Sequence, residues 1–199
     1  MSARHPLACV LMASGFSRRF GSDKLLAGHR GRPLYAWAMD AIPPEAFAQA
    51  VVVARCPEVA RAARARGFFA LSRPEATEHI AGTIREGLRA VTDTKAPIAG
   101  CCFVACDQPL LARQSVEELA AAFQREPQCI WALSHGGERG SPVIFPASLF
   151  EELRALAPTE RGSTVIQRHE GLLRLLEARH PWELLDVDIL EDLAALPGP

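Results

Sequence analysis

Apolar residues gather in short, nearly uninterrupted runs along this chain. Runs of strand length occur at 7–14, 50–54, 68–72, 99–106 and 129–134, with two less regular ones at 141–145 and 184–188. Continuous apolar runs are typical of strands that are covered on both faces. The pattern therefore predicts a buried, mostly parallel sheet.

Segments with helical periodicity separate these runs. They lie at 33–42, 57–66, 81–92, 112–125 and 147–155, and a last short helix is expected after 188. In the third segment Ile84, Leu88 and Val91 fall on one side, as an amphipathic helix requires. The alternation predicts a three-layer α/β fold, in which a mostly parallel, twisted sheet carries helices on both faces and right-handed crossovers join its strands.

Composition narrows the class of protein. The chain has 199 residues, of which 49% are hydrophobic and 23% charged, and its formal net charge is −1. These values are ordinary for one compact domain and give no electrostatic reason to expect nucleic acid as a partner. The apolar stretch near the N-terminus is too short to span a membrane and no cleavage-site pattern follows it, so a cytoplasmic protein is expected.

Six cysteines lie mostly within apolar runs: Cys9, Cys56, Cys101, Cys102, Cys106 and Cys129. We interpret them as small buried hydrophobic residues. The alternative is a metal cluster. The sequence does not favour it, because no second Cys/His pair accompanies Cys102 and Cys106.

Ligands of open α/β sheets bind at the carboxyl ends of strands, which here points to the loops after residues 14, 106 and 134. The first loop reads GFSRRFGSDK and ends at Lys24. Its glycines let backbone amides approach an anion closely, and Arg19 and Lys24 add full positive charges. This mixture predicts a polyphosphate site, although the glycine fingerprints of ATPases and dinucleotide enzymes are absent. The alternative is a charged loop that is only solvated.

Three aspartates follow or lie within later strand-like segments. Asp107 closes a buried strand, where a carboxylate is well placed to hold Mg²⁺ beside phosphates. Its alternative role is to cap the helix at 112–125. Asp186 and Asp188 alternate along the predicted strand 184–188, so they should share one face and could complete a metal site with Asp107. Either of them could instead cap the last helix.

Taken in order, these clusters resemble the nucleotidyltransferases of the molybdenum cofactor type, the MobA-like NTP transferases. The segment Met12–Lys24 is similar to the family pattern L-A-A-G-x-S-x-R-x-G-x-x-K, and Cys106–Pro109 is similar to the G-D-Q-P of the cytidylyltransferase branch. Arg139–Val143 resembles R-G-x-P-V, Asp186–Leu193 resembles D-I-D-T-P-E-D-L, and Gly82–Leu88 loosely matches a middle helix. The resemblance covers nearly the whole chain.

The resemblance implies a nucleotide-diphospho-sugar transferase-like, Rossmann-like fold. It implies a Mg²⁺-dependent transfer of CMP from CTP to a molybdopterin-type cofactor, with release of pyrophosphate and a molybdenum hydroxylase as recipient of the product. The implied catalytic residues are Arg19, Lys24 and Asp107, and the implied metal ligands are Asp107, Asp188 and Asp186. The implied nucleotide-binding residues are Met12, Ala13, Ser14, Gly15, Ser17, Arg19, Lys24 and Gly82.

Two departures from the family pattern keep alternatives open. Ser14 stands where cytidylyl enzymes usually have Ala and guanylyl enzymes Gly, and the family's G-D-x-G-x-R appears as TERGST at 159–164. One alternative is a transferase that uses GTP or another nucleotide with a different phosphate acceptor. The other is a non-catalytic, cofactor-binding chaperone of a molybdenum hydroxylase. The chain is expected to form one domain over 1–199, with 1–134 binding the nucleotide and 135–199 shaping the acceptor site and carrying the C-terminal motif.

Overall fold

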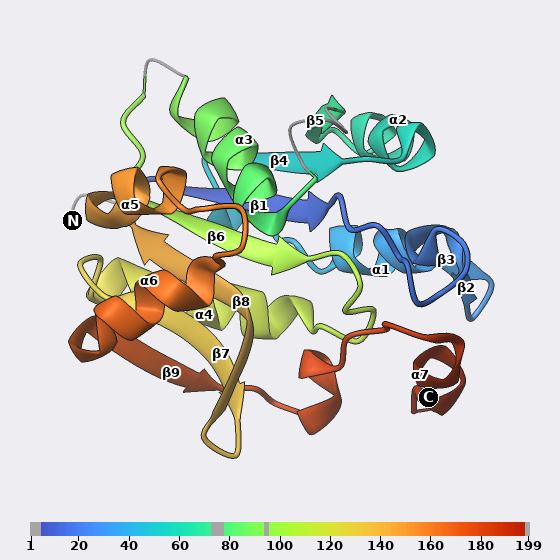
Figure 1. The fold of residues 1–199 in the computed structure, drawn as a ribbon. Helices are drawn as coiled ribbons and strands as arrows, with labels where there is room; N and C mark the ends of the chain where they lie inside the picture. The colour runs from blue at the N-terminus through green and yellow to red at the C-terminus, as the bar shows by residue number, and fades with distance from the viewer. Residues whose placement is uncertain (1–4, 73–77, 94–95, 198–199) are drawn as a thin grey trace.

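The computed structural model describes residues 5–72, 78–93 and 96–197, and a seven-stranded sheet forms its centre (Figure 1). The strand order is β5-β4-β1-β6-β8-β7-β9, and β2 pairs with β3 in a separate hairpin. The strands are β1 (Leu7–Ala13), β2 (Gly28–His29), β3 (Arg32–Pro33), β4 (Gln49–Ala54), β5 (Phe69–Ser72), β6 (Gly100–Ala105), β7 (Ile130–His135), β8 (Glu138–Pro146) and β9 (Leu173–Glu177).

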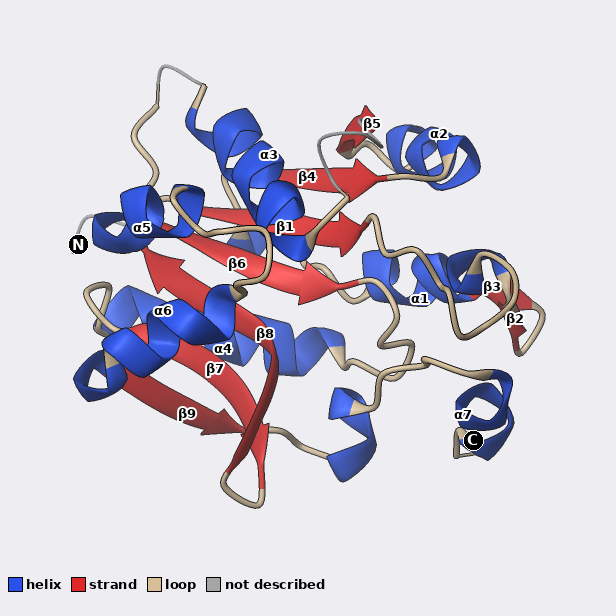
Figure 2. Ribbon diagram, in the orientation of Figure 1, coloured by secondary structure: helices blue, strands red, loops and turns tan. Residues whose placement is uncertain are grey.

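Helices cover both faces of this sheet (Figure 2). They are α1 (Leu34–Asp40), α2 (Pro57–Ala65), α3 (Ile80–Thr92), α4 (Arg113–Arg125), α5 (Phe150–Arg154), α6 (Gly162–Arg168) and α7 (Leu190–Ala195). Alternation along β1 explains the layers, because successive side chains of a strand point to opposite faces. Leu7, Cys9 and Leu11 pack in a buried cluster with α1, α2 and α4, whereas Ala8 and Val10 pack in another with α3, α5 and α6.

The predicted fold class is confirmed. Only β8 runs antiparallel to its neighbours in the seven-stranded sheet, and the other pairs are parallel. The apolar faces predicted for the helix at 81–92 are also confirmed, since Ile84, Leu88 and Val91 are buried. Within the described ranges, no helix has the length and apolar character needed to cross a membrane.

The strand predicted at 184–188 is wrong. The chain forms a 3₁₀ turn over Pro181–Leu184 and then an extended loop, while the edge of the sheet is taken by β9. The sequence of β9, LRLLE, has only half-buried and exposed positions because an edge strand is only partly covered, so it produces no continuous apolar run. The argument that Asp186 and Asp188 share a strand face therefore fails, and their position has another cause, described below.

The strand order places a crevice between β1 and β6. From β1 the chain proceeds to β4 and β5 on one side and then returns to β6 on the other. The loops that leave β1 and β6 consequently diverge at the carboxyl edge of the sheet. Such a switch point is where open α/β sheets bind ligands.

The packing of α3 on β1 depends on a glycine, which gives a first prediction. A Cβ at Gly87 would lie 2.5 Å from Val10 Cγ1, which is too close for two carbon atoms. We expect Gly87→Ala to lower the free energy of unfolding by up to about 2 kcal/mol, because overpacking costs about 1–3 kcal/mol and the gain in helix propensity returns about 1 kcal/mol. Urea denaturation measures this change. Gly171→Ala is the control, since no atom lies within 4 Å of its Cβ position, and equal stability of the two variants would contradict the expectation.

Candidate active site

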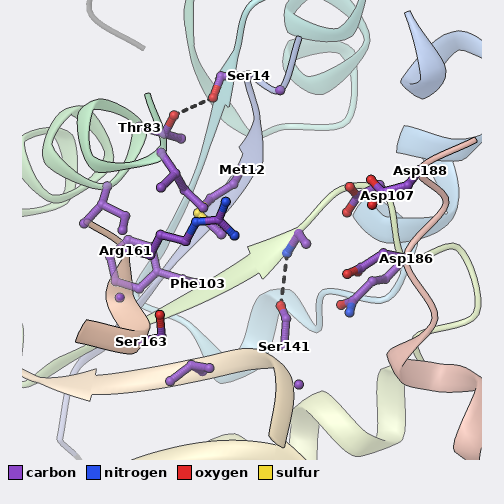
Figure 3. A pocket seen from close by; sticks show the side chains of 18 of the residues that line it. Met12, Ser14, Thr83, Phe103, Asp107, Ser141, Arg161, Ser163, Asp186 and Asp188 are labelled. Carbon is purple, nitrogen blue, oxygen red and sulfur yellow. Dashed lines mark hydrogen bonds between the residues drawn. The ribbon is translucent and has the colours of Figure 1, made fainter. Parts of the chain in front are cut away.

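A pocket of about 1280 Å³ opens at the switch point between β1 and β6. Two sides of it differ in chemistry (Figure 3). Asp107, Asp186 and Asp188 lie together on one side, whereas Arg161 lies on the opposite side, near Met12 and Phe103 (Figure 3). The pocket is thus acidic where the loop after β6 meets the C-terminal segment, and it carries an arginine across from these acids.

The loop after β1 folds tightly around Ser17. Ser17 adopts a left-handed backbone conformation (φ 51°), as does Gly21 (φ 80°), and the loop turns back on itself at these two residues. The Lys24 backbone N–H donates to Ser17 Oγ at 3.1 Å, which closes the loop. Phe20 anchors it in a small buried cluster with Leu34 and Val187. This local structure delivers the Lys24 side chain to the pocket rather than to solvent.

On the acidic side of the pocket, Lys24 forms ion pairs with Asp107 and Asp188. Its Nζ lies 2.6 Å from Asp107 Oδ2 and 2.8 Å from Asp188 Oδ1, and Arg19 Nη2 lies 2.6 Å from Asp188 Oδ2. Burial on its own would lower the pKa of Lys24, but the charges and hydrogen bonds of Asp107 and Asp188 outweigh it and raise this pKa above its ordinary value. The hydrogen bond from Lys24 in turn holds the pKa of Asp188 below its ordinary value.

The C-terminal segment is fastened beside Asp107 by its backbone. The Val187 N–H donates to the carbonyl oxygen of Asp107 at 3.0 Å, and the Val187 side chain is fully buried. Just upstream, the buried carboxylate of Glu183 accepts hydrogen bonds from the backbone N–H groups of His180 (3.0 Å) and Ala112 (3.2 Å). These contacts, rather than strand pairing, bring Asp186 and Asp188 to the pocket.

The pKa of Asp186 is raised to about 6. Desolvation within the pocket is the largest cause and the charge of Asp107 is the next, while a hydrogen bond from Gln108 acts in the opposite direction. Two aspartates that are separated by a single residue thus differ in electrostatic environment. Asp188 is paired with two cations, and Asp186 faces another carboxylate.

This difference predicts stability changes of opposite sign. Folding raises the pKa of Asp186, so its contribution to stability falls as pH rises from about 4 to about 6. We expect Asp186→Asn to stabilise the ligand-free protein at neutral pH, by on the order of 1 kcal/mol once solvent screening of this partly exposed carboxyl is allowed for. Below pH about 4 this gain should vanish. Asp188→Asn should instead destabilise the protein at neutral pH, because it breaks two ion pairs. Thermal unfolding of the two variants at neutral pH and below pH about 4 measures these changes. Shifts of the same sign at neutral pH would contradict the different environments assigned to Asp186 and Asp188.

The acidic side fits a divalent cation of the magnesium kind. Such ions prefer carboxylate oxygens and usually take only one or two from the protein, with phosphate oxygens and water as further ligands. Among the described residues no group of three or more His, Cys, Asp or Glu forms a ready-made metal site. Asp107 and Asp188 already converge on one positively charged atom, and the adjacent Gln108 Oε1 is buried without a hydrogen-bond partner in the described structure.

Most of the residues singled out from the sequence line the pocket. They are Met12, Ser14, Gly15, Ser17, Arg19, Lys24, Asp107, Asp186 and Asp188. Ala13 and Gly82 are buried and do not belong to the lining; Ala13 packs in the core on the α1, α2 and α4 side, and Gly82 lies in the first turn of α3. Asp107 does not cap the helix predicted at 112–125, because α4 begins after Ala112, whose N–H donates to Glu183.

The cysteines behave as the apolar runs suggest. All six are free, and all but Cys56 are buried. Burial raises the pKa of the Cys101 and Cys106 thiols, which keeps them protonated.

Several pocket residues were not named as site residues from the sequence, although each lies in a stretch compared above with a family motif. Thr83, on α3, shares a hydrogen bond between hydroxyls with Ser14 (Figure 3). Ser141 Oγ accepts a hydrogen bond from the Ala105 N–H at 3.3 Å. Arg161 precedes α6, a helix that was not expected because its sequence begins with Gly-Ser-Thr. Glycine, serine and threonine have modest or low helix propensity, so the sequence did not predict a helix here. The position of Arg161 just before a helix was therefore not expected.

Comparison with known proteins agrees with this geometry. Residues 9–172 match the MobA-like NTP transferase domain. A probable molybdenum cofactor guanylyltransferase from Bacillus licheniformis is 24% identical over 92% of this chain and 93% of its own length. Among solved structures, a nucleotidyl transferase from Methanothermobacter has a TM-score of 0.78 at 19% identity, covering 95% of this chain and 94% of that one.

A further solved structure, Rv0371c from Mycobacterium tuberculosis in complex with manganese, has a TM-score of 0.68 at 20% identity and covers 96% of this chain and 97% of that one. At these identities the structural likenesses show the fold alone. The family match, however, extends over the loop after β1, the strand end at Asp107 and α6. The chain therefore belongs to the MobA-like NTP transferase family and is a nucleotidyltransferase.

Proposed function

We propose that this nucleotidyltransferase transfers CMP from CTP to a phosphate of a molybdopterin-type cofactor, with Mg²⁺ as the divalent metal. The observation that carries the proposal is the meeting of Lys24, Asp107 and Asp188 on the lining of the pocket. A metal–triphosphate complex needs positive charge for its phosphates and negative charge for its metal. The lysine from the loop after β1 supplies the first, and the carboxylates from two other segments supply the second. The product would then pass to a molybdenum hydroxylase.

The chemistry asks the protein for positioning and charge. An oxygen of the acceptor phosphate attacks the α-phosphorus of the nucleotide, the bond from this phosphorus to the bridging oxygen breaks, and pyrophosphate leaves. Lys24 and Arg19 stabilise the negative charge that develops on the leaving phosphates, and backbone amides of the loop Gly15–Lys24 orient them. Asp107 and Asp188 would hold the divalent metal, which, when bound, neutralises phosphate charge and aligns the oxygens.

The acceptor is assigned to the side of the pocket built by 135–199. His135 and Arg139, from the hairpin between β7 and β8, line this side together with Arg161 and Ser163 at the start of α6. Cationic and hydroxyl groups of this kind suit an acceptor that carries a phosphate. The division of labour proposed for the chain is therefore nucleotide binding by 1–134 and acceptor binding by the β7–β8 hairpin and the start of α6, while the C-terminal motif adds Asp188 to the metal site.

CTP is the proposed nucleotide because Asp107-Gln108-Pro109 follows the cytidylyltransferase pattern. GTP is the competing candidate, because the Bacillus licheniformis relative carries the name of a guanylyltransferase. Ser14 stands at the end of β1, where its hydroxyl is bonded to Thr83, and both side chains line the pocket. A base that lies against this pair meets two hydroxyl groups, which can hydrogen-bond to cytosine or to guanine.

A thermal-shift screen with CTP, GTP, ATP and UTP, each with and without Mg²⁺, tests the proposal. A ligand at a hundredfold its dissociation constant stabilises a protein by about 2.7 kcal/mol. We expect stabilisation by CTP that depends on Mg²⁺, and release of pyrophosphate when the acceptor is added. Stabilisation by GTP alone would overturn the choice of base and keep the reaction class. A response to none of the four nucleotides would overturn the proposal, and it is the result expected of a cofactor-binding chaperone.

A further inference from the structure

The Lys24 ammonium sits where the proposed function needs a divalent cation. Its Nζ contacts Asp107 and Asp188 directly, at 2.6 and 2.8 Å, and its side chain is only 10% exposed. Two carboxylate oxygens from distant parts of the chain thus converge on a single positive charge. A metal ion bound to the same two residues would have to take the place of this ammonium.

Charge balance makes that exchange unfavourable for a metal on its own. Lys24 and Arg19 already offset the charges of Asp107 and Asp188, so of the three aspartates only Asp186 has no cation among the described residues paired with it to weaken its attraction for a divalent ion. A metal that entered alone would also leave the buried ammonium without a partner, which is costly. A nucleotide removes both obstacles to metal binding. Its phosphates give Lys24 and Arg19 new partners, and they bring negative charge that attracts the metal.

We propose that Lys24 is a placeholder that keeps divalent metal off Asp107 and Asp188 until the phosphates of a nucleotide draw its ammonium away. This inference rests on the proposed function, and it adds an order of events. Metal and nucleotide bind with strong positive coupling, and the coupling is reciprocal. The site resists metal when it holds no nucleotide.

Binding of Mn²⁺ without nucleotide, followed by electron paramagnetic resonance, tests the placeholder directly. We expect Lys24→Gln to bind Mn²⁺ roughly tenfold more tightly than the unchanged protein, or better, because a positive charge in contact with both ligands is gone. Adding Asp107→Asn to this variant should abolish the gain. Arg18→Gln is the matched control: Arg18 lines the same pocket but lies over the Phe16 ring, 5.1 Å from its centroid, so its loss frees neither carboxylate.

Equal Mn²⁺ affinity of Lys24→Gln and the unchanged protein would overturn the placeholder, as would an equal gain in Arg18→Gln. Either result leaves the proposed function standing, because that function is judged by the nucleotide screen. If the screen shows no nucleotide binding, the proposed function fails. The Mn²⁺ titration contains no nucleotide, so it still shows whether Lys24 keeps metal off the two aspartates.

A second measurement needs no change at Lys24 and so does not depend on how that variant folds. The chain has two lysines, Lys24 and Lys95, and Lys95 lies outside the described residues. In protein labelled with ¹⁵N-lysine, Lys95→Arg assigns the two Nζ signals. We expect millimolar Mg²⁺ alone to leave the Lys24 signal in place, and Mg²⁺ with a non-hydrolysable analogue of CTP or GTP to move it. A shift with Mg²⁺ alone, or no shift with Mg²⁺ and the nucleotide analogue that binds, would overturn the inference.

Discussion

Lys24→Ala is expected to lower turnover by roughly two to three orders of magnitude while the fold stays intact. Loss of one preplaced cationic or hydrogen-bonding group that acts on developing charge costs about 3 kcal/mol of transition-state stabilisation. Lys24 is well placed for this role because it is buried, and its carboxylate partners raise its pKa, so it remains protonated throughout the neutral range. Steady-state kinetics of pyrophosphate release measures the loss, and circular dichroism checks the fold.

Arg113→Ala is the matched control for Lys24→Ala. Arg113 also bridges two carboxylates, Glu45 and Glu117, but it lies at the start of α4 and does not line the pocket. Its removal should leave turnover unchanged. Turnover of Lys24→Ala equal to that of the unchanged protein would remove Lys24 from the catalytic machinery.

Asp107→Asn is expected to lower turnover by a similar roughly two to three orders of magnitude and to raise the metal concentration that gives half of the maximal rate. The substitution keeps the shape of the side chain and leaves the backbone carbonyl free to accept the bond from Val187, so the C-terminal segment should stay in place. What changes is the negative charge that faces Lys24 and the metal. The test is turnover as a function of Mg²⁺ and of Mn²⁺ concentration.

Asp40→Asn provides the comparison for this acid. Asp40 is an ion-paired aspartate at the end of α1, bonded to Arg32, and it lies outside the pocket lining. Its loss should alter neither turnover nor metal dependence. An Asp107→Asn enzyme with normal turnover and normal metal dependence would show that the metal binds elsewhere.

The central layer of the fold follows from the sequence for a simple physical reason. Strands such as β1 and β6 are covered on both faces, so nearly every residue in them must be apolar, and their run stands out at once. The loops at their carboxyl ends could then be located by the rule for switch points. Lys24 and Asp107 were recognised as site residues on this basis.

The rest of the site could not be predicted from the sequence, because it depends on contacts between segments that are far apart along the chain. Asp186 and Asp188 reach the pocket because Val187 bonds to Asp107 and packs on Phe20, and no periodicity in the sequence encodes such a contact. Local patterns also gave no sign that a buried Glu183 holds the preceding turn against α4. Nor did they show that the Lys24 side chain is held by two carboxylates.

The distance in sequence between Lys24 and Asp188 bears on how the enzyme is made. The two residues are separated by 164 positions, so the ribosome completes the loop of Lys24 long before it adds Asp188. Domains begin to fold while synthesis proceeds, and the sheet up to β9 can assemble before Asp188 emerges. If Asp188 serves nucleotide transfer as proposed, competence for the reaction follows the synthesis of all seven strands of the sheet.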